Sequence, residues 1–260
     1  MTHANPNEID LLYSDKKDAD FWKKNAREHG RLYWVRAMTT RAFEEGPATP
    51  ASLAPGSPSP AVRAGLYKAL ARAFRYADEA LARDVSSGAF RREAAGAVSV
   101  LGKAVAVDEG LSLLAVFQGL DPGDVLDHLQ TKYTRLFYDS YMPFVPAYES
   151  IYSHEQQMNG ARAERAREIY RQGGFQPPTE EMVDHVSVEL DGLAHLLRKQ
   201  GSGEGAEGLA SSLLFGHLVR WAGKFCADVE ELSGSEFYRG TAMILRGVLS
   251  LEEKGREGGA

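Results

Sequence analysis

The chain of 260 residues contains one cysteine, Cys226. A single cysteine excludes an intrachain disulfide framework and any zinc or iron–sulfur site that needs several thiolates, so we expect a reducing compartment. The neighbours of Cys226 on a predicted helix are apolar (Phe225, Ala227 and Val229). A buried structural thiol is therefore favoured over a catalytic nucleophile.

Long apolar runs and an excess of positive charge are also missing. No window reaches the roughly 18 consecutive apolar residues that a membrane helix needs. The first residues, MTHANPNEIDLLYSDKK, contain no positive region followed by an apolar stretch, so we expect no signal peptide. A formal net charge of −6 lacks the basic signature of a nucleic-acid binder. These features predict a cytoplasmic protein that neither binds nucleic acid nor associates stably with membranes.

Motifs for catalysis and for metals are absent as well. The sequence contains no glycine-rich dinucleotide loop after a strand, no phosphate-binding loop with its lysine, and no Gly-x-Ser-x-Gly elbow. None of the seven histidines has a glutamate three residues before it, which excludes the Glu-x-x-His pairs of di-iron bundles. We therefore expect no enzymatic activity, no cofactor and no metal.

Proline placement divides the chain. Five of the eleven prolines fall in GPATPASLAPGSPSP, residues 46–60, a composition that is typical of an extended linker. Residues 1–45 before this Pro/Gly/Ser-rich linker are predicted to form an N-terminal helical extension. Residues 61–255 after it are predicted to form one all-helical domain.

Helical periodicity dominates residues 61–255. Residues 61–121 and 179–260 contain no proline and are rich in strong helix formers, and sustained strand-like alternation is found nowhere. The pattern predicts an all-α fold, a single helical bundle. Three apolar stripes at helical spacing carry this prediction: Val125, Leu126, Leu129, Tyr133, Leu136 and Phe137 after Pro122; Val186, Leu190, Leu193 and Leu197; and Leu214, Leu218, Trp221 and Phe225.

Two segments interrupt the helices. Residues 139–152, DSYMPFVPAYESIY, are aromatic and contain two prolines, and we expect them to form an irregular surface loop of the kind that often carries function. Residues 173–181, GGFQPPTEE, end one helix and open the next, for which Thr179 is the predicted N-cap and Glu180 and Glu181 favour the N-terminus.

Charged residues near the second break allow several interpretations. Glu181, His185 and Glu189 are spaced to share one side of a helix, and a polar stripe of Glu–His pairs is favoured over a binding role or a metal site. Adjacent helical residues point about 100° apart, so Asp184 and His185 are expected to serve different partners rather than to form a catalytic dyad. The basic run ARAERAREIYR, with Arg162, Arg165, Arg167 and Arg171, is interpreted as a solvated helix face rather than a phosphate site.

Several short patterns follow one another in a familiar order. They are Tyr133-x-x-Leu136-Phe137, Pro143-x-x-Pro146-x-Tyr148-Glu149-Ser150-x-Tyr152, Tyr170-x-x-Gly173-Gly174, Asp184-His185-x-x-x-Glu189-Leu190-x-x-Leu193, Phe215-x-His217-Leu218-x-x-Trp221-x-x-x-Phe225 and Phe237-Tyr238. This order resembles the TorD/DmsD/NarJ family of molybdoenzyme-specific chaperones over residues 130–240. One departure is Val183, where family members often have proline before the aspartate.

The resemblance implies a TorD-like helical chaperone without cofactor, either a monomer or a domain-swapped dimer. Family members bind the twin-arginine leader or the apo-form of a catalytic subunit of the DMSO reductase family, and hold it in the cytoplasm for molybdenum-cofactor insertion before export. Weak guanine-nucleotide binding is a further option. The client-binding candidates are Tyr133, Phe137, Pro143, Pro146, Tyr148, Glu149, Tyr152, Asp184, His185 and Glu189.

Simple chemistry is compatible with this role. A twin-arginine leader needs carboxylates for its guanidinium groups, for which Glu149, Asp184 and Glu189 are candidates. Its apolar stretch needs an apolar groove, for which the four aromatic candidates supply a wall. For each of these client-binding candidates, a purely structural role in the bundle is an equally simple alternative to contact with the client. At the level of function, the alternatives are a helical scaffold that binds a folded partner without leader recognition, and a nucleotide hydrolase.

Overall fold

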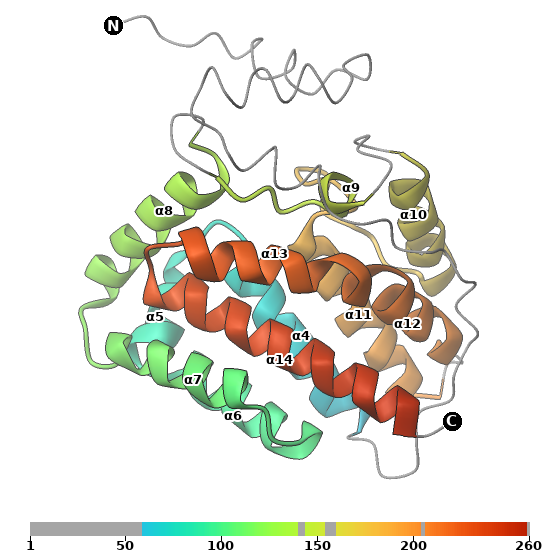
Figure 1. Cartoon of the computed structure of the whole chain (residues 1–260), viewed down its shortest axis with the longest axis horizontal. Helices are drawn as coiled ribbons and strands as arrows, with labels where there is room; N and C mark the ends of the chain where they lie inside the picture. The colour runs from blue at the N-terminus through green and yellow to red at the C-terminus, as the bar shows by residue number, and fades with distance from the viewer. Residues whose placement is uncertain (1–58, 140–143, 154–159, 204–205, 259–260) are drawn as a thin grey trace, which may run out of the picture.

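The computed structural model describes residues 59–139, 144–153, 160–203 and 206–258, and most of these residues are helical (Figure 1). No strand occurs among them, which confirms the prediction of an all-α fold. The predicted extension at residues 1–45, most of the predicted linker at 46–60, and Pro143 lie outside the described residues. The division of the chain into these parts therefore stays a prediction.

The helices follow one another with short connections. A 3₁₀ turn at Ala115–Phe117 follows α7, and a π-helical turn at Leu214–Leu218 links α12 to α13. The α-helices are α4 Pro60–Ala73, α5 Glu79–Ser86, α6 Ala89–Leu101, α7 Val105–Leu114, α8 Pro122–Phe137, α9 Glu149–Tyr152, α10 Ala161–Gly173, α11 Val186–Gly201, α12 Glu207–Leu213, α13 Val219–Leu232 and α14 Glu236–Gly258.

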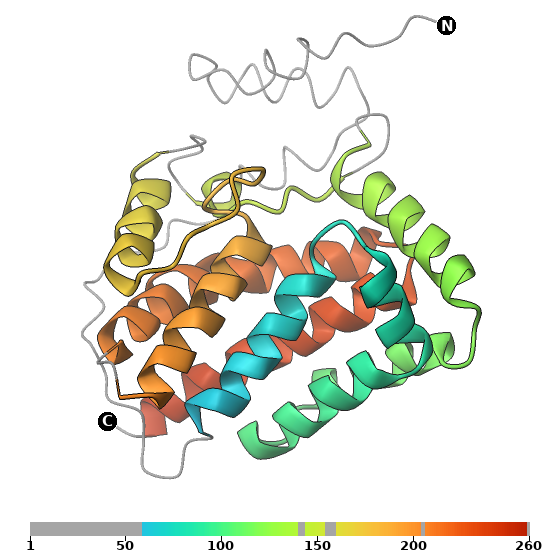
Figure 2. The same cartoon turned by 180° about the vertical axis from the view of Figure 1, so that it is seen from behind.

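Helix α4 lies at the centre of the bundle. It packs along α11, as Figure 2 shows, and it also contacts α6 and α14. Helix α14 packs in turn against α7 and α13. Arg63 of α4 is almost fully buried, and its Nε and Nη2 atoms donate to the two carboxylate oxygens of Glu252 on α14 at 2.8 and 2.9 Å. Tyr67 donates a further hydrogen bond to Glu252 Oε1 at 3.0 Å, so three polar groups tie α4 to α14.

Helix α8 agrees closely with its prediction. Asp121 is the N-cap, and its Oδ1 accepts from the backbone N–H of Gly123 at 2.8 Å. Pro122 occupies the first helical turn, where a missing N–H costs nothing. The predicted stripe faces the core at Val125, Leu129, Tyr133, Leu136 and Phe137, while Leu126 is only partly buried.

The segment that links α8 to α9 differs from its prediction. Residues 144–147 are buried, so the expectation of a surface loop is wrong for them. Their backbone is paired: Val145 N–H donates to Leu136 O at 2.7 Å, and Ala147 O accepts from Val186 N–H at 2.8 Å. Because these polar backbone groups have partners, burial does not leave them unsatisfied. In both views this segment and α9 run along one face of the bundle, between α8 and α10 (Figures 1 and 2).

Helix α11 begins later than predicted. Its first residue is Val186 and its N-cap is His185, not Thr179. The residues before it extend instead alongside the 144–148 segment, because Asp184 O accepts from Glu149 N–H at 2.9 Å and Tyr148 forms an isolated antiparallel bridge with His185. Glu181 therefore lies outside the helix, and the predicted helical stripe of Glu181, His185 and Glu189 is wrong, although Glu181 Oε2 still lies 3.9 Å from His185 Nε2. The stripe from Val186 to Leu197 is confirmed as buried.

The π-helical turn at Leu214–Leu218 interrupts an otherwise continuous helical rod from α12 to α13. The predicted stripe of Leu214, Leu218, Trp221 and Phe225 passes through it and is fully buried. π-Turns inside helices are rare and frequently occur at functional sites. This one carries His217, which is also buried.

Candidate functional site

Five polar side chains meet beneath α9, and we call them the buried polar cluster: Glu149 of α9, Arg162 of α10, Glu189 of α11, His217 of the π-turn and Trp221 of α13. Arg162 Nη1 donates to Glu149 Oε1 at 3.0 Å, and His217 Nδ1 lies 2.7 Å from Glu149 Oε2. Trp221 Nε1 donates to Glu189 Oε2 at 3.0 Å. Side chains from α9, α10, α11, the π-turn and α13 thus converge on two carboxyl groups.

The two carboxyl groups differ in charge. Burial alone raises the pKa of Glu149, but the hydrogen bond and charge of His217, together with Arg162, outweigh it and lower that pKa below its usual range. Burial, and then the neighbouring Glu149 carboxylate, raise the pKa of Glu189 well above its usual range. Like charges in contact within a low-dielectric interior cannot both be retained without a cation. Glu149 is therefore the ionised member of the pair.

Asp184 and His185 hold the neighbouring backbone in place. Asp184 Oδ2 accepts from the N–H of Ser150 at 3.1 Å, so its side chain supports the first turn of α9. His185 caps α11, since its Nδ1 accepts from Ser187 N–H at 3.2 Å. Its ring lies edge-on to Tyr148, with 5.1 Å between ring centroids. The two residues serve different partners, as the sequence predicted.

The other predicted residues occupy two environments. Tyr133, Phe137 and Pro146 are buried, and Tyr133 donates a hydrogen bond to Phe74 O at 3.3 Å. Tyr148 and Tyr152 are half-buried, and Tyr152 packs on Trp221 at 5.5 Å. The structure thus brings Glu149, Asp184, His185 and Glu189 together where α9 meets the start of α11, and Tyr148 and Tyr152 lie beside them. Tyr133 and Phe137 are instead part of the hydrophobic core. Pro143 is outside the described residues.

Arg162 corrects one sequence interpretation. Its side chain is only 11% exposed and pairs with Glu149, whereas Arg167 and Arg171 pair with Glu164 and Glu168 on the solvated face. The spacing of the run gave no signal for this, because the residue that Arg162 meets comes from a different helix. For His217 and Trp221 a signal existed, since they stand four positions apart, one helical turn, and Trp221 is on a predicted apolar stripe. Neither was predicted to belong to the site.

The sequence around this site is similar to a known protein family. A family model described as nitrate reductase delta subunit matches residues 103–227. Over these residues, just under half of the chain, the sequence is similar to this family. The resemblance to the TorD/DmsD/NarJ chaperones is thereby confirmed, and the family is one of molybdoenzyme maturation chaperones rather than catalysts. The comparison with curated proteins gave no match.

The part of the chain matched by the delta-subunit family contains the buried polar cluster entirely. It also contains the 144–148 segment and the start of α11. Among the described residues, no helix is both long and apolar enough to cross a membrane.

Tyrosines form the surface beside this site, and we call Tyr76, Tyr138, Tyr148 and Glu181 the tyrosine surface. Tyr76 and Tyr138 are 57% and 58% exposed, which is unusual for large rings. Both pack on the buried ring of Tyr133, at 5.6 and 5.8 Å. Tyr148 donates a hydrogen bond to Glu181 Oε1 at 3.3 Å. The result is an exposed aromatic area with a carboxylate within it.

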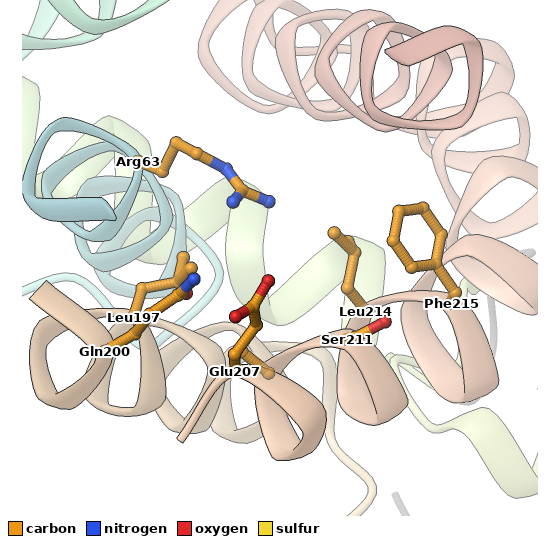
Figure 3. Close-up of a pocket in the computed structure, with 8 residues that line it drawn as sticks. Arg63, Leu197, Gln200, Glu207, Ser211, Leu214 and Phe215 are labelled. Carbon is orange, nitrogen blue, oxygen red and sulfur yellow. The ribbon is translucent and has the colours of Figure 1, made fainter. Parts of the chain in front are cut away.

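A separate pocket lies among α4, α11, α12 and the π-turn (Figure 3). Leu197, Leu214 and Phe215 line it, and the Arg63 guanidinium faces it. Because Glu252 already binds that guanidinium through both carboxylate oxygens, Arg63 is not available to hold an anionic ligand.

His185 makes stability depend on pH. Burial, and then the positive charge of Arg75, lower the pKa of His185 to about 3, against about 6.5 in the unfolded chain. A base whose pKa is depressed by folding stabilises the protein fully above the unfolded pKa, and this contribution is lost as pH falls from about 6.5 towards 3. We expect the free energy of unfolding to fall by about 1.4 kcal/mol per pH unit in this window from His185 alone, measured by urea unfolding at a series of pH values.

The matched variant is His185→Asn, because asparagine also caps helices and does not titrate. Its pH profile is expected to be flatter than that of the wild type by the His185 contribution. Identical slopes for the two proteins between pH 6 and 4.5 would show that His185 is not the source of the dependence.

Proposed function

We propose that the chain is a cytoplasmic chaperone for the catalytic subunit of a molybdenum-cofactor oxidoreductase. It binds the twin-arginine leader, the apo-form of that subunit, or both, and holds the subunit for cofactor insertion before export. It acts as a monomer or a domain-swapped dimer. The observation that carries the proposal is the delta-subunit family match over residues 103–227, which spans all ten candidate residues.

The candidate residues divide by burial into a framework and a contact surface. Glu149, Asp184 and Glu189 have no exposed surface, and Glu149 already has a guanidinium partner in Arg162. We assign these three acids, with His185, to the framework that positions the 144–148 segment and α9. Tyr148 and Tyr152 reach the surface, and we assign contact with the client to them.

The tyrosine surface fits the chemistry of a leader. Tyrosine faces attract guanidinium groups and pack against apolar side chains. Glu181 offers a partly exposed carboxylate beside them. Burial raises the pKa of Glu181, so pairing with an incoming cation favours its ionised form. An arginine pair followed by an apolar stretch therefore has both a carboxylate and aromatic rings available on one face.

The test is a calorimetric titration of the protein with a synthetic twin-arginine leader from a client molybdoenzyme subunit. Binding is expected, and it is expected to weaken when both arginines are changed to lysine, because an ammonium group cannot reproduce the planar guanidinium fork. Tyr148→Ala and Glu181→Gln are each expected to weaken binding by about two- to fivefold, the scale of one exposed cation–π or surface charge contact.

Glu180→Gln is the matched control, since Glu180 is the exposed neighbour of Glu181 and its variant is expected to bind like the wild type. Equal affinity for the arginine and lysine peptides contradicts leader reading. Binding of the apo-subunit without its leader assigns recognition to the body of the client. If neither peptide nor apo-subunit binds, the helical scaffold that binds a folded partner replaces the proposal.

A further inference from the structure

Three potential metal-binding side chains meet in the buried polar cluster. Glu149, Glu189 and His217 each offer one ligand atom, and these atoms lie within 4.8 Å of one another. They come from α9, α11 and the π-turn. Because the three residues come from separate elements, the spacing of ligands along one helix does not reveal this set.

Protein groups already hydrogen-bond to both carboxyl groups. Arg162 donates to Oε1 of Glu149, and the His217 imidazole forms a hydrogen bond with its Oε2. Trp221 donates to Oε2 of Glu189, which leaves Oε1. Protein groups that hydrogen-bond to metal-ligating carboxylates fix their orientation in known metal sites. The cluster therefore has the supporting hydrogen bonds of a metal site as well as candidate ligands.

The Oε1 atom of Glu189 also favours a bound cation at this cluster. Glu189 is completely buried, and no hydrogen-bond donor among the described residues reaches its Oε1 atom. A buried carboxyl oxygen without a donor costs free energy. The nearest groups in the cluster are another carboxylate and an imidazole, so a bound cation is the kind of group that this oxygen lacks.

The backbone conformation at His217 also favours a metal site. It lies in the π-helical turn Leu214–Leu218, a local conformation that costs regular helical hydrogen bonding and is often retained where a side chain must be aimed. Here the turn places the ring nitrogen 2.7 Å from Glu149 Oε2.

We infer that Glu149, Glu189 and His217 bind a divalent first-row transition metal ion within the bundle. Oxygen and imidazole donors without thiolate suit Zn²⁺ and Mn²⁺. The ligand distances of about 2.0–2.2 Å in such sites require Glu189 to move inward slightly. The Nδ1 proton of His217 and the proton of Glu189 are released to solvent as the ion binds. The two carboxylates balance the double charge, and Arg162 keeps its bonds to Glu149 Oε1 and Gly216 O.

The ion's role is to hold three segments together. It joins α9, which follows the 144–148 segment, to α11 and to the rod formed by α12 and α13. No substrate is required to reach it, because its ligands are buried. Three protein ligands leave the fourth position of a tetrahedral site to a water molecule. Burial also means that loading takes place during folding or through slow local opening of the bundle.

The test is elemental analysis by mass spectrometry of the full chain, purified without a histidine tag and without chelators. About one equivalent of a transition metal per chain is expected, since structural sites retain their ion through purification. After unfolding in chelator and refolding, the protein is expected to melt at a higher temperature with Zn²⁺ present than without it.

Glu189→Gln is the decisive variant, because glutamine keeps the size of the side chain and an acceptor for Trp221 but is a poor ligand. It is expected to fold, to contain no metal and to show no response to Zn²⁺. Glu181→Gln, which changes an acid outside the cluster, is expected to retain the ion. A wild-type protein without metal after both isolation and refolding in Zn²⁺ overturns the inference, and so does a Glu189→Gln protein that still binds the ion. In either case the pair of carboxyl groups shares a proton instead.

Discussion

Replacing Arg162 by methionine is expected to destabilise the protein by about 3–5 kcal/mol, the usual cost of removing one partner of a buried ion pair. The Glu149 carboxylate is completely buried, and without Arg162 it retains a charge for which His217 is the remaining partner within the cluster. Methionine fills most of the volume, so the loss reports charge rather than a cavity. Urea unfolding followed by circular dichroism measures it as a lower midpoint.

Arg167→Met is the matched control on the same helix. Arg167 is 46% exposed and pairs with Glu164 one turn away, so its loss is expected to cost about 0.5 kcal/mol or less. The double variant Arg162→Met/Glu149→Gln is expected to regain part of the stability, because it no longer buries an unpaired charge. Equal midpoints for the Arg162 and Arg167 variants would contradict the role assigned to Arg162.

Replacing Glu252 by leucine is expected to cost about 3–5 kcal/mol. The change leaves the Arg63 guanidinium, which is 2% exposed, without its two charge-assisted hydrogen bonds, and it removes the acceptor of the Tyr67 hydroxyl. Differential scanning calorimetry is expected to show one cooperative transition at a clearly lower temperature.

Glu253→Leu is the control at the adjacent position, where the side chain is exposed, and little change is expected. The double variant Arg63→Met/Glu252→Leu is expected to recover most of the loss, since apolar replacement of a whole buried ion pair is often neutral or stabilising. A Glu252 variant as stable as the Glu253 variant would show that α4 and α14 do not depend on this contact.

The helices were predictable because their signals are local. The stripe from Val125 to Phe137 and the cap at Asp121 lie within one continuous segment, and each follows from the spacing or chemistry of neighbouring residues. The buried stripes of α11 and α13 were predictable for the same reason.

The errors arose where a partner comes from far along the chain. Residues 144–147 have the composition of a surface loop, but backbone groups of Leu136 and Val186 satisfy them and allow burial. The same pairing keeps Asp184 and His185 out of helix α11. Arg162 sits in a run that is typical of a solvated face, and only the approach of α9 to α10 gives it a carboxylate to bind.

The contact between Arg63 and Glu252 joins residues 189 positions apart. Helix α4 also packs mainly against α11, more than a hundred residues downstream. Among the described helices, a chain made from its N-terminus therefore presents α4 first and the helices that cover it, α11 and α14, much later. During synthesis on the ribosome, the apolar surface of α4 stays exposed until nearly the whole domain has been made. Such exposure favours aggregation of the nascent chain. The chain that we propose as a chaperone therefore exposes apolar surface of its own during synthesis.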